Sequence, residues 1–296
     1  MLRDFVLPPA SVERAALAGS SPPPPVRDAA TVMLIDDLPD GGVSVLAFRR
    51  RSTLAFAPGM LVFPGGAVDA DDVRVAAEHG GPDAAGGGLD AVRVAAVRET
   101  FEECGVLLAA PAPGPTGAGS LEVGATDLAR LRADLLAGRI DLAGVLRETG
   151  TRLRSDRLLP WAHWITPAFE PRRYDTRFFV AVVPEGQDPA EWGEEAEEGL
   201  IPGLEGGWLS AAEAVARHRA GGLAMLPPTL VCLEELAAAP SVAAVFATVR
   251  RPRPVTPWLA WTAGPGGRRE QVLRVDLDGV GGGADGGEGE GEVGDG

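Results

Sequence analysis

The sequence contains no lysine, so all 27 of its Lys or Arg side chains are arginine, and the 42 acidic side chains outnumber them. The formal net charge of −15 argues against a nucleic-acid-binding protein, because phosphate contacts require clustered positive charge. Together with 40 glycines and 26 prolines, the missing lysine is typical of translation from a GC-rich genome. Glycine clusters therefore carry less structural information here than usual.

Cysteine and histidine are also scarce. The two cysteines, Cys104 and Cys232, lie among apolar residues and are expected to pack as small core side chains. The three histidines (His79, His163 and His218) are isolated, so no zinc site is predicted. No apolar run has the length of a signal peptide or a membrane span. These absences predict a cytoplasmic, reducing location and no membrane partner.

The chain is long enough to bury a full core. We predict a Pro-rich N-terminal lead-in over residues 1–28, one elaborated domain over 29–250 and a C-terminal extension over 251–278. Residues 279–296 hold five acidic side chains, no base and little that is apolar, which predicts a disordered acidic Gly-rich tail.

One segment places three carboxylates on one side of a helix. Glu99, Glu102 and Glu103 stand at positions i, i+3 and i+4, where like charges repel and destabilise an isolated helix. A bound cation would remove that repulsion. The opposite side of the same helix carries Val94, Val97, Phe101 and Cys104 at the spacing of a helix docked on a core.

An acidic helix face is usually just solvated, and taken alone that interpretation would be preferred. The upstream sequence favours a binding site instead. Phe63-Pro64-Gly65-Gly66 indicates a strand end followed by a tight glycine turn, and two further carboxylates, Asp69 and Asp72, come directly after it.

These residues together resemble the Nudix hydrolase box, whose pattern is G-x5-E-x7-R-E-U-x-E-E-x-G-U with U apolar or Thr. Gly66 takes the first glycine, and Asp72 stands where the first glutamate belongs. Arg98 to Val106 match the second half position by position. Residues 73–97 replace the seven-residue spacer, so the box is interrupted. We expect residues 73–90 to form an exposed inserted loop, with Asp90 capping the following helix.

The interrupted box is similar to that of the Nudix branch containing the peroxisomal coenzyme A diphosphatases of animals and their bacterial relatives. Arg51-Ser52, Gly59, Trp164 to Pro167 and Arg173 to Phe179 add to this resemblance. It implies an α/β (α+β) Nudix fold, in which a mixed β-sheet is sandwiched between helices. The leucine spacing between residues 111 and 158 predicts two helices in a second insertion, called here the helical insertion.

Alternating and apolar runs predict the other elements. The expected strands cover residues 31–35, 43–48, 60–63, 106–109, 162–165, 178–183 and 208–209, and a late strand covers 272–277. Ser210 is expected to cap a helix that runs to about Arg219, and helices are expected over 228–238 and 242–249.

The resemblance implies a Mg²⁺ or Mn²⁺ site. Glu102 and Glu103 are the first candidate ligands, Glu99 is a ligand or the catalytic base, and the Gly66 carbonyl is a further contact. Arg98 would hold the carboxylates in place. Two alternatives stay open for Asp72: it pairs with Arg98, or it is a solvated loop acid. The family often supplies one more acid from a later loop, and the acidic run at 194–198 offers several candidates or is simply solvated.

Four arginines are candidate substrate ligands: Arg51, Arg172, Arg173 and Arg177. Guanidinium groups suit bidentate binding of phosphate oxygens, although salt bridges to the many acids are a competing explanation.

The leading hypothesis is a metal-dependent diphosphatase that converts coenzyme A or acyl-coenzyme A to 3′,5′-ADP and 4′-phosphopantetheine compounds. ADP-ribose, NADH or dinucleotides are alternative substrates, because fold does not fix substrate. A non-hydrolytic nucleotide-binding regulator is the alternative from another class, but a pure binder has no need of mutually repelling carboxylates. The expected partner is a small nucleotide-derived molecule, and the oligomeric state, a homodimer included, stays open.

Overall fold

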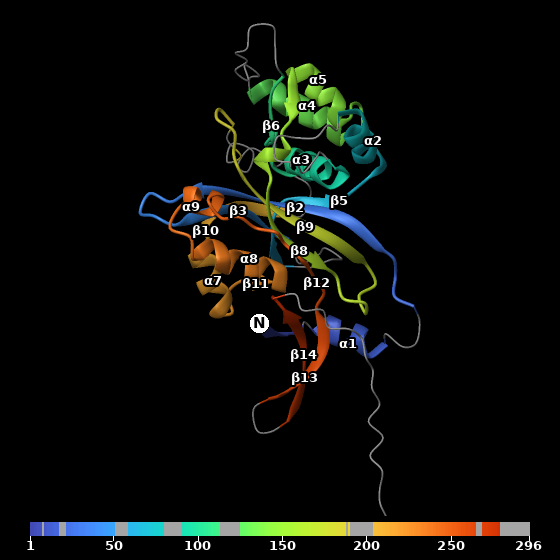
Figure 1. Cartoon of the computed structure of the whole chain (residues 1–296), viewed down its shortest axis with the longest axis vertical. Coiled ribbons are helices and arrows are strands. Elements are labelled where there is room, and N and C mark those ends of the chain that lie inside the picture. The colour runs from blue at the N-terminus through green and yellow to red at the C-terminus, as the bar shows by residue number, and fades with distance from the viewer. Residues whose placement is uncertain are drawn as a thin grey trace, which may run out of the picture.

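The computed structural model describes residues 1–7, 9–17, 22–50, 59–79, 90–112, 125–187, 189, 204–264 and 268–278. A mixed β-sheet lies at its centre, between two groups of helices (Figure 1). The described strands follow the order β11-β4-β3-β2-β9-β8-β12, while β10 also pairs with β3 and β5 with β2. Their bounds are β2 Val26–Asp37, β3 Val43–Arg50, β4 Met60–Val62, β5 Gly65–Ala67, β8 Leu159–Ile165, β9 Arg173–Val182, β10 Leu204–Ser210, β11 Ala224–Met225 and β12 Pro254–Val255. The expected α/β architecture is confirmed.

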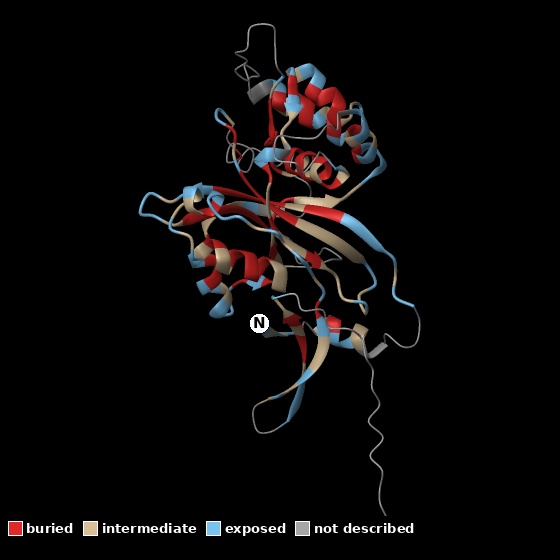
Figure 2. Ribbon diagram, in the orientation of Figure 1, coloured by how far each residue is buried: buried red, intermediate tan, exposed pale blue. Residues whose placement is uncertain are grey.

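Strand β2 runs through the middle of the sheet and is apolar on both sides. Ala30, Val32 and Leu34 belong to the hydrophobic core on one face, whereas Met33 and Ile35 belong to the core on the other. All five are fully buried (Figure 2). Because helices cover both faces, the strand reads as a continuous apolar run and not as an alternating one.

The helices form one layer on each face. The first layer contains α2 (Ala70–His79), α3 (Ala91–Cys104), α4 (Ala125–Leu136) and α5 (Leu142–Thr149). The second contains α7 (Ala211–Arg219), α8 (Pro227–Ala237) and α9 (Val242–Phe246). As expected, Ser210 caps α7 by accepting from the Glu213 N–H. Among the described residues, none of the helices is both long and apolar enough to cross a membrane.

The helical insertion leaves and rejoins the domain through a short antiparallel ladder. Strand β6 (Ala109–Pro111) pairs with β7 (Thr151–Leu153), followed by a short 3-10 helix at Ser155–Arg157. Between the two strands come α4 and α5, the two helices predicted from the leucine spacing. Asp141 caps α5 by accepting from the Gly144 N–H, and Gly150 ends it with a φ of 62°.

Two expectations about local structure are wrong. The loop expected over residues 73–90 is helix α2 as far as His79, and residues 80–89 lie outside the described part of the chain. The strand expected over 106–109 begins only at Ala109. Leu107 is fully buried, but its N–H and C=O bond to the side-chain amide of Gln187 in place of a neighbouring strand.

The segment expected to be a lead-in is partly structured. Strand β1 (Leu2–Val6) pairs with β14 (Arg269–Asp276), which also pairs with β13 (Trp258–Ala263). This three-stranded sheet joins residues from opposite ends of the sequence, and helix α1 (Pro9–Leu17) follows β1 (Figure 1). The late strand predicted near residue 272 is thus confirmed as β14. The tail over 279–296 lies outside the described residues.

Candidate active site

Helix α3 carries the candidate catalytic residues and is fixed at both ends. The Asp90 side chain caps its start by accepting from the Arg93 N–H at 2.9 Å. Gly105 ends it with a φ of 71°, a left-handed conformation that suits glycine. Val94, Val97 and Phe101 are at most 1% exposed, so the predicted apolar side does pack on the core. The opposite, acidic side is therefore turned toward α2, β5 and the helical insertion.

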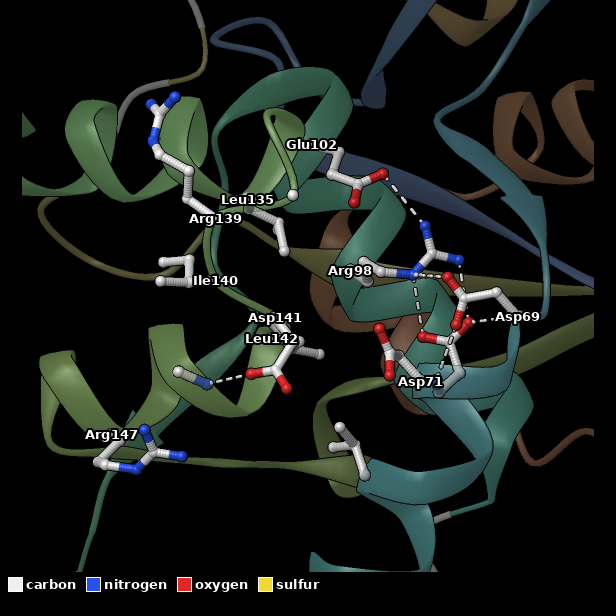
Figure 3. Close-up of a pocket in the computed structure, with 14 residues that line it drawn as sticks. Asp69, Asp71, Arg98, Glu102, Leu135, Arg139, Ile140, Asp141, Leu142 and Arg147 are labelled. Atoms are coloured by element: carbon white, nitrogen blue, oxygen red, sulfur yellow. Dashed lines mark hydrogen bonds and ion pairs between the residues drawn. The ribbon is translucent and has the colours of Figure 1, made fainter.

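Arg98 is the centre of the candidate site (Figure 3). Its Nε and Nη2 atoms donate to the two carboxylate oxygens of Asp72, each at 2.9 Å. Its Nη1 atom donates to Glu99 at 2.9 Å and to Glu102 at 3.1 Å. Asp69 lies 3.5 Å from Nε. One guanidinium thus organises four carboxylates, and its bidentate bond to Asp72 fixes its plane.

The question left open for Asp72 is answered by this geometry. Asp72 pairs with Arg98, and its side chain is only 1% exposed. It also accepts from the Asp69 N–H while the Asp69 carboxylate accepts from the Asp72 N–H, a reciprocal capping box at the start of α2. The Asp69-x-x-Asp72 spacing was the sequence signal for this helix. Sequence reasoning missed it because the glycines that follow residue 79 favoured a loop.

The glycine turn brings its backbone directly against the acidic helix. The Gly65 N–H donates to Glu103 at 2.9 Å. A Cβ added at Gly66 would lie 2.2 Å from the Glu99 carboxylate. The predicted ligands Gly66, Glu99 and Glu103 are therefore neighbours, and Glu102 joins them through Arg98.

We expect the two glycines to respond differently to alanine. Gly65 has a φ of 155°, and its Cβ would meet the Ala30 backbone oxygen at 2.3 Å. Gly65→Ala should therefore destabilise the fold by about 2 kcal/mol. Gly66→Ala should mainly displace the Glu99 side chain and lower kcat by roughly 10-fold or more with a smaller loss of stability. Urea unfolding and steady-state rates on both variants test this, and equal losses of stability would contradict it.

The site has an excess of negative charge, and its carboxylates are mostly shielded from water, except for Asp69, whose side chain is 49% exposed. Four carboxylates surround a single guanidinium. Burial raises the pKa of Asp72 and of Glu99, despite the opposing effect of Arg98. Burial likewise raises the pKa of Glu102 to about 7. A carboxylate cluster with one cation therefore has a deficit of positive charge, which a bound divalent ion would reduce.

The donor set fits a hard divalent cation. Carboxylate and carbonyl oxygens are the ligands that Mg²⁺ and Mn²⁺ prefer. Within the described ranges, however, no three acidic, histidine or cysteine side chains are already grouped as metal ligands. Arg98 and the Gly65 N–H hold the glutamates instead, so binding a cation requires Glu102 or Glu103 to exchange part of these contacts.

The raised pKa of Glu102 predicts a pH effect on the metal-free protein. Its carboxyl releases its proton near pH 4.5 when unfolded, but only at about pH 7 when folded. Stability should therefore fall as pH rises through this window, because the unfolded state ionises first. Urea midpoints in a chelator at pH 5 and pH 8 should show a smaller fall for Glu102→Gln than for wild type. An identical fall in both proteins would contradict this origin.

The helical insertion contacts α3, the helix that carries the glutamates, and α2 beside it. Arg132 on α4 is 4% exposed, and its Nε donates to the Glu102 carbonyl at 2.8 Å. This contact satisfies a carbonyl in the last turn of α3, where a cation is also favoured by the helix dipole. On the other side, Arg74 of α2 pairs with Asp141 of the insertion. Sequence reasoning did not single out either arginine.

A cavity of about 580 Å³ separates the acidic cluster from the helical insertion. Asp69, Arg98 and Glu102 line one side (Figure 3). The other side is lined by Arg139, Ile140 and Asp141 from the turn between α4 and α5, and by Leu142 and Arg147 from α5. The cavity is therefore built jointly by the interrupted box and the second insertion.

Of the four arginines predicted as substrate ligands, the three that the structure describes do not line this cavity. Arg51 lies outside the described residues, as does the acidic run at 194–198. Arg173 donates to the Thr166 and Pro24 carbonyls, and Arg172 is exposed. Arg177 lines a second cavity of about 190 Å³ near the start of α3. Their roles in substrate binding stay predictions.

Comparison with known proteins agrees with this geometry. The family model described as NUDT19 Nudix domain matches residues 83–236, about half of the chain. "Putative nudix hydrolase 7" of Caenorhabditis elegans is 31% identical over 192 residues, covering 65% of this chain and 55% of that protein. "Acyl-coenzyme A diphosphatase NUDT19" of Gallus gallus is 26% identical over 253 residues, covering 68% of this chain and 65% of that protein. The chain thus spans between about half and two thirds of the length of these curated relatives.

A solved structure shares the fold. A NUDIX hydrolase from Alicyclobacillus acidocaldarius has a TM-score of 0.62 and 28% identity, covering 76% of this chain and 97% of that chain. The mixed sheet, the glycine turn and the carboxylate helix thus define a Nudix domain. The chain belongs to the Nudix hydrolase family, in its NUDT19-type branch, as the interrupted box predicted.

Proposed function

We propose that the protein is a Mg²⁺- or Mn²⁺-dependent diphosphatase that hydrolyses coenzyme A or acyl-coenzyme A to 3′,5′-ADP and 4′-phosphopantetheine compounds. One observation carries the hydrolytic part of this proposal: Arg98 gathers Asp69, Asp72, Glu99 and Glu102 at the edge of a cavity of about 580 Å³. The coenzyme A part is supported by two relatives that are acyl-coenzyme A diphosphatases by name, from Gallus gallus and Xenopus laevis.

In this proposal Glu99, Glu102, Glu103 and the Gly66 carbonyl would hold the metal. When bound, a divalent cation supplies charge neutralisation for the diphosphate and activation of a water molecule. The chain's own residues determine where that happens. Arg98 orients the Glu99 and Glu102 carboxylates, and Asp72 holds Arg98 through two hydrogen bonds. Arg132 fixes the backbone of the last turn of α3. Glu99, placed against Gly66, acts as ligand or as general base.

Two other functions remain in competition. ADP-ribose, NADH and dinucleotides contain the same diphosphate linkage, so the acidic cluster alone does not discriminate among them. A non-hydrolytic nucleotide-binding regulator would keep the cavity but gain nothing from several buried carboxylates, which raise the cost of folding. The first alternative is therefore the stronger of the two.

A substrate panel with product analysis tests the proposal. Coenzyme A, acetyl-coenzyme A, ADP-ribose, NADH and a diadenosine polyphosphate are each incubated with the purified protein in Mg²⁺, Mn²⁺ or EDTA. Chromatography should find 3′,5′-ADP from the coenzyme A species only when metal is present. Faster cleavage of ADP-ribose or a dinucleotide would reject coenzyme A as substrate and retain the diphosphatase. The absence of any cleavage, with tight nucleotide binding, would support the regulator.

A further inference from the structure

The two sides of the large cavity differ in charge. The side formed by α2 and α3 carries Asp69, Asp71, Asp72 and Glu102; Arg98 contacts three of these carboxylates, and Arg74 pairs with Asp71. The side formed by the helical insertion carries Arg139 and Arg147 with a single acid, Asp141 (Figure 3). Asp141 is already engaged with the Gly144 N–H and with Arg74. The insertion therefore offers the cavity an excess of positive charge in a strongly acidic chain.

The side chains of Arg147 and Arg139 differ in their contacts. Within the described part of the chain, the Arg147 side chain makes no hydrogen bond or ion pair, and it is exposed at the cavity. Arg139 donates to Asp134 at 2.6 Å from its Nε atom, and its side chain is 61% exposed. A surface ion pair of this kind is weak, so its guanidinium can turn toward a ligand at little cost.

We infer that the helical insertion forms a second anion-binding site, in which Arg147, assisted by Arg139, binds a terminal phosphate of the substrate at a distance from the diphosphate. Guanidinium groups bind phosphate through paired N–H donors. The acidic side of the cavity repels such a group, whereas the insertion attracts it. The substrate class is therefore a nucleoside diphosphate derivative with an additional phosphomonoester.

This inference rests on the proposed function and narrows it. Coenzyme A has a 3′-phosphate in addition to its diphosphate, whereas dephospho-coenzyme A, ADP-ribose and NADH have none. An anion site in the insertion would therefore favour binding of coenzyme A over dephospho-coenzyme A, ADP-ribose and NADH. Apolar side chains on the insertion side, Ile140 and Leu142, offer contacts for the uncharged parts of such a molecule.

The kinetic test compares coenzyme A with dephospho-coenzyme A. Arg147→Ala should raise KM for coenzyme A by roughly 10-fold, and Arg139→Ala/Arg147→Ala by more, with kcat changed less than about twofold. The KM for dephospho-coenzyme A should stay at the wild-type value in both variants. Arg217→Ala is the matched control, because Arg217 is exposed on α7, on the opposite face of the sheet. Equal effects on both substrates would overturn the inference.

A binding test separates this inference from the proposed function. Calorimetry in Mg²⁺ compares 3′,5′-ADP with 5′-AMP, which differ only in the additional phosphate, and needs no turnover. Wild type should bind 3′,5′-ADP more tightly, and Arg139→Ala/Arg147→Ala should bind the two about equally. No preference in wild type, or a preference that survives both substitutions, would overturn the second anion site. If coenzyme A is not cleaved but the preference follows Arg147, only the proposed reaction is rejected.

Discussion

Replacing Glu102 or Glu103 with glutamine is expected to lower kcat by at least about 100-fold while the fold stays intact. Glutamine keeps the shape of the side chain and a carbonyl oxygen, so Glu103→Gln can still accept from the Gly65 N–H. It removes the negative charge that a divalent cation requires. Steady-state rates across a Mg²⁺ titration would show the loss, and circular dichroism would verify the fold.

The same substitution should not destabilise the metal-free protein. Glu102 has a pKa raised by burial, so its ionised form is disfavoured in the folded state near neutral pH. Glu102→Gln in a chelator should therefore melt at the same temperature as wild type or higher. Glu78→Gln is the matched control, because Glu78 is an exposed acid on neighbouring α2 and should leave kcat unchanged. Near-wild-type turnover in both variants would mean that neither Glu102 nor Glu103 holds a metal ion that the reaction needs.

The sequence predicted the central sheet and helix α3 because their patterns are local. The apolar run from Thr31 to Ile35, the Ser210 cap and the leucine spacing of the helical insertion each specify one element without reference to the rest of the chain. The apolar side of α3 was predicted for the same reason. Elements whose hydrogen bonds come from distant residues were not predicted: Leu107 is bonded to the Gln187 side chain, and β1 pairs with β14.

In the candidate site, too, the sequence predicted what depends on local spacing and did not predict what depends on packing between elements. Spacing alone placed Glu99, Glu102 and Glu103 on one side of a helix. It could not decide whether Asp72 reached Arg98 across the interrupted box, because that depends on how α2 packs against α3. The sequence also did not indicate that the helical insertion contributes side chains to the site. Arg132 and Arg147 are ordinary helix residues in sequence, and only the fold brings the first to the end of α3 and the second to the cavity.

The largest effect on stability is expected at Arg98. Its guanidinium is the cation that Asp72 and Glu99 contact, and their side chains are only 1% and 15% exposed. Arg98→Met keeps the bulk of the side chain but leaves these carboxylates buried without a counter-ion. Removing one partner of a buried ion pair typically costs about 3–5 kcal/mol. We expect the free energy of unfolding in a chelator at pH 8 to fall by that amount.

A control and a rescue distinguish this cause from loss of packing. Arg74→Met removes ion pairs to Asp71, Glu78 and Asp141, but Arg74 is 40% exposed, so the loss should stay below about 1 kcal/mol. Asp72→Asn in the Arg98→Met background removes the most deeply buried of the stranded charges and should restore part of the stability. The deficit of Arg98→Met should also shrink at pH 5, because carboxyls without a cation keep their protons more readily. A deficit independent of pH and of Asp72 would show that Arg98 stabilises the fold by packing, and that the carboxylates do not depend on its charge.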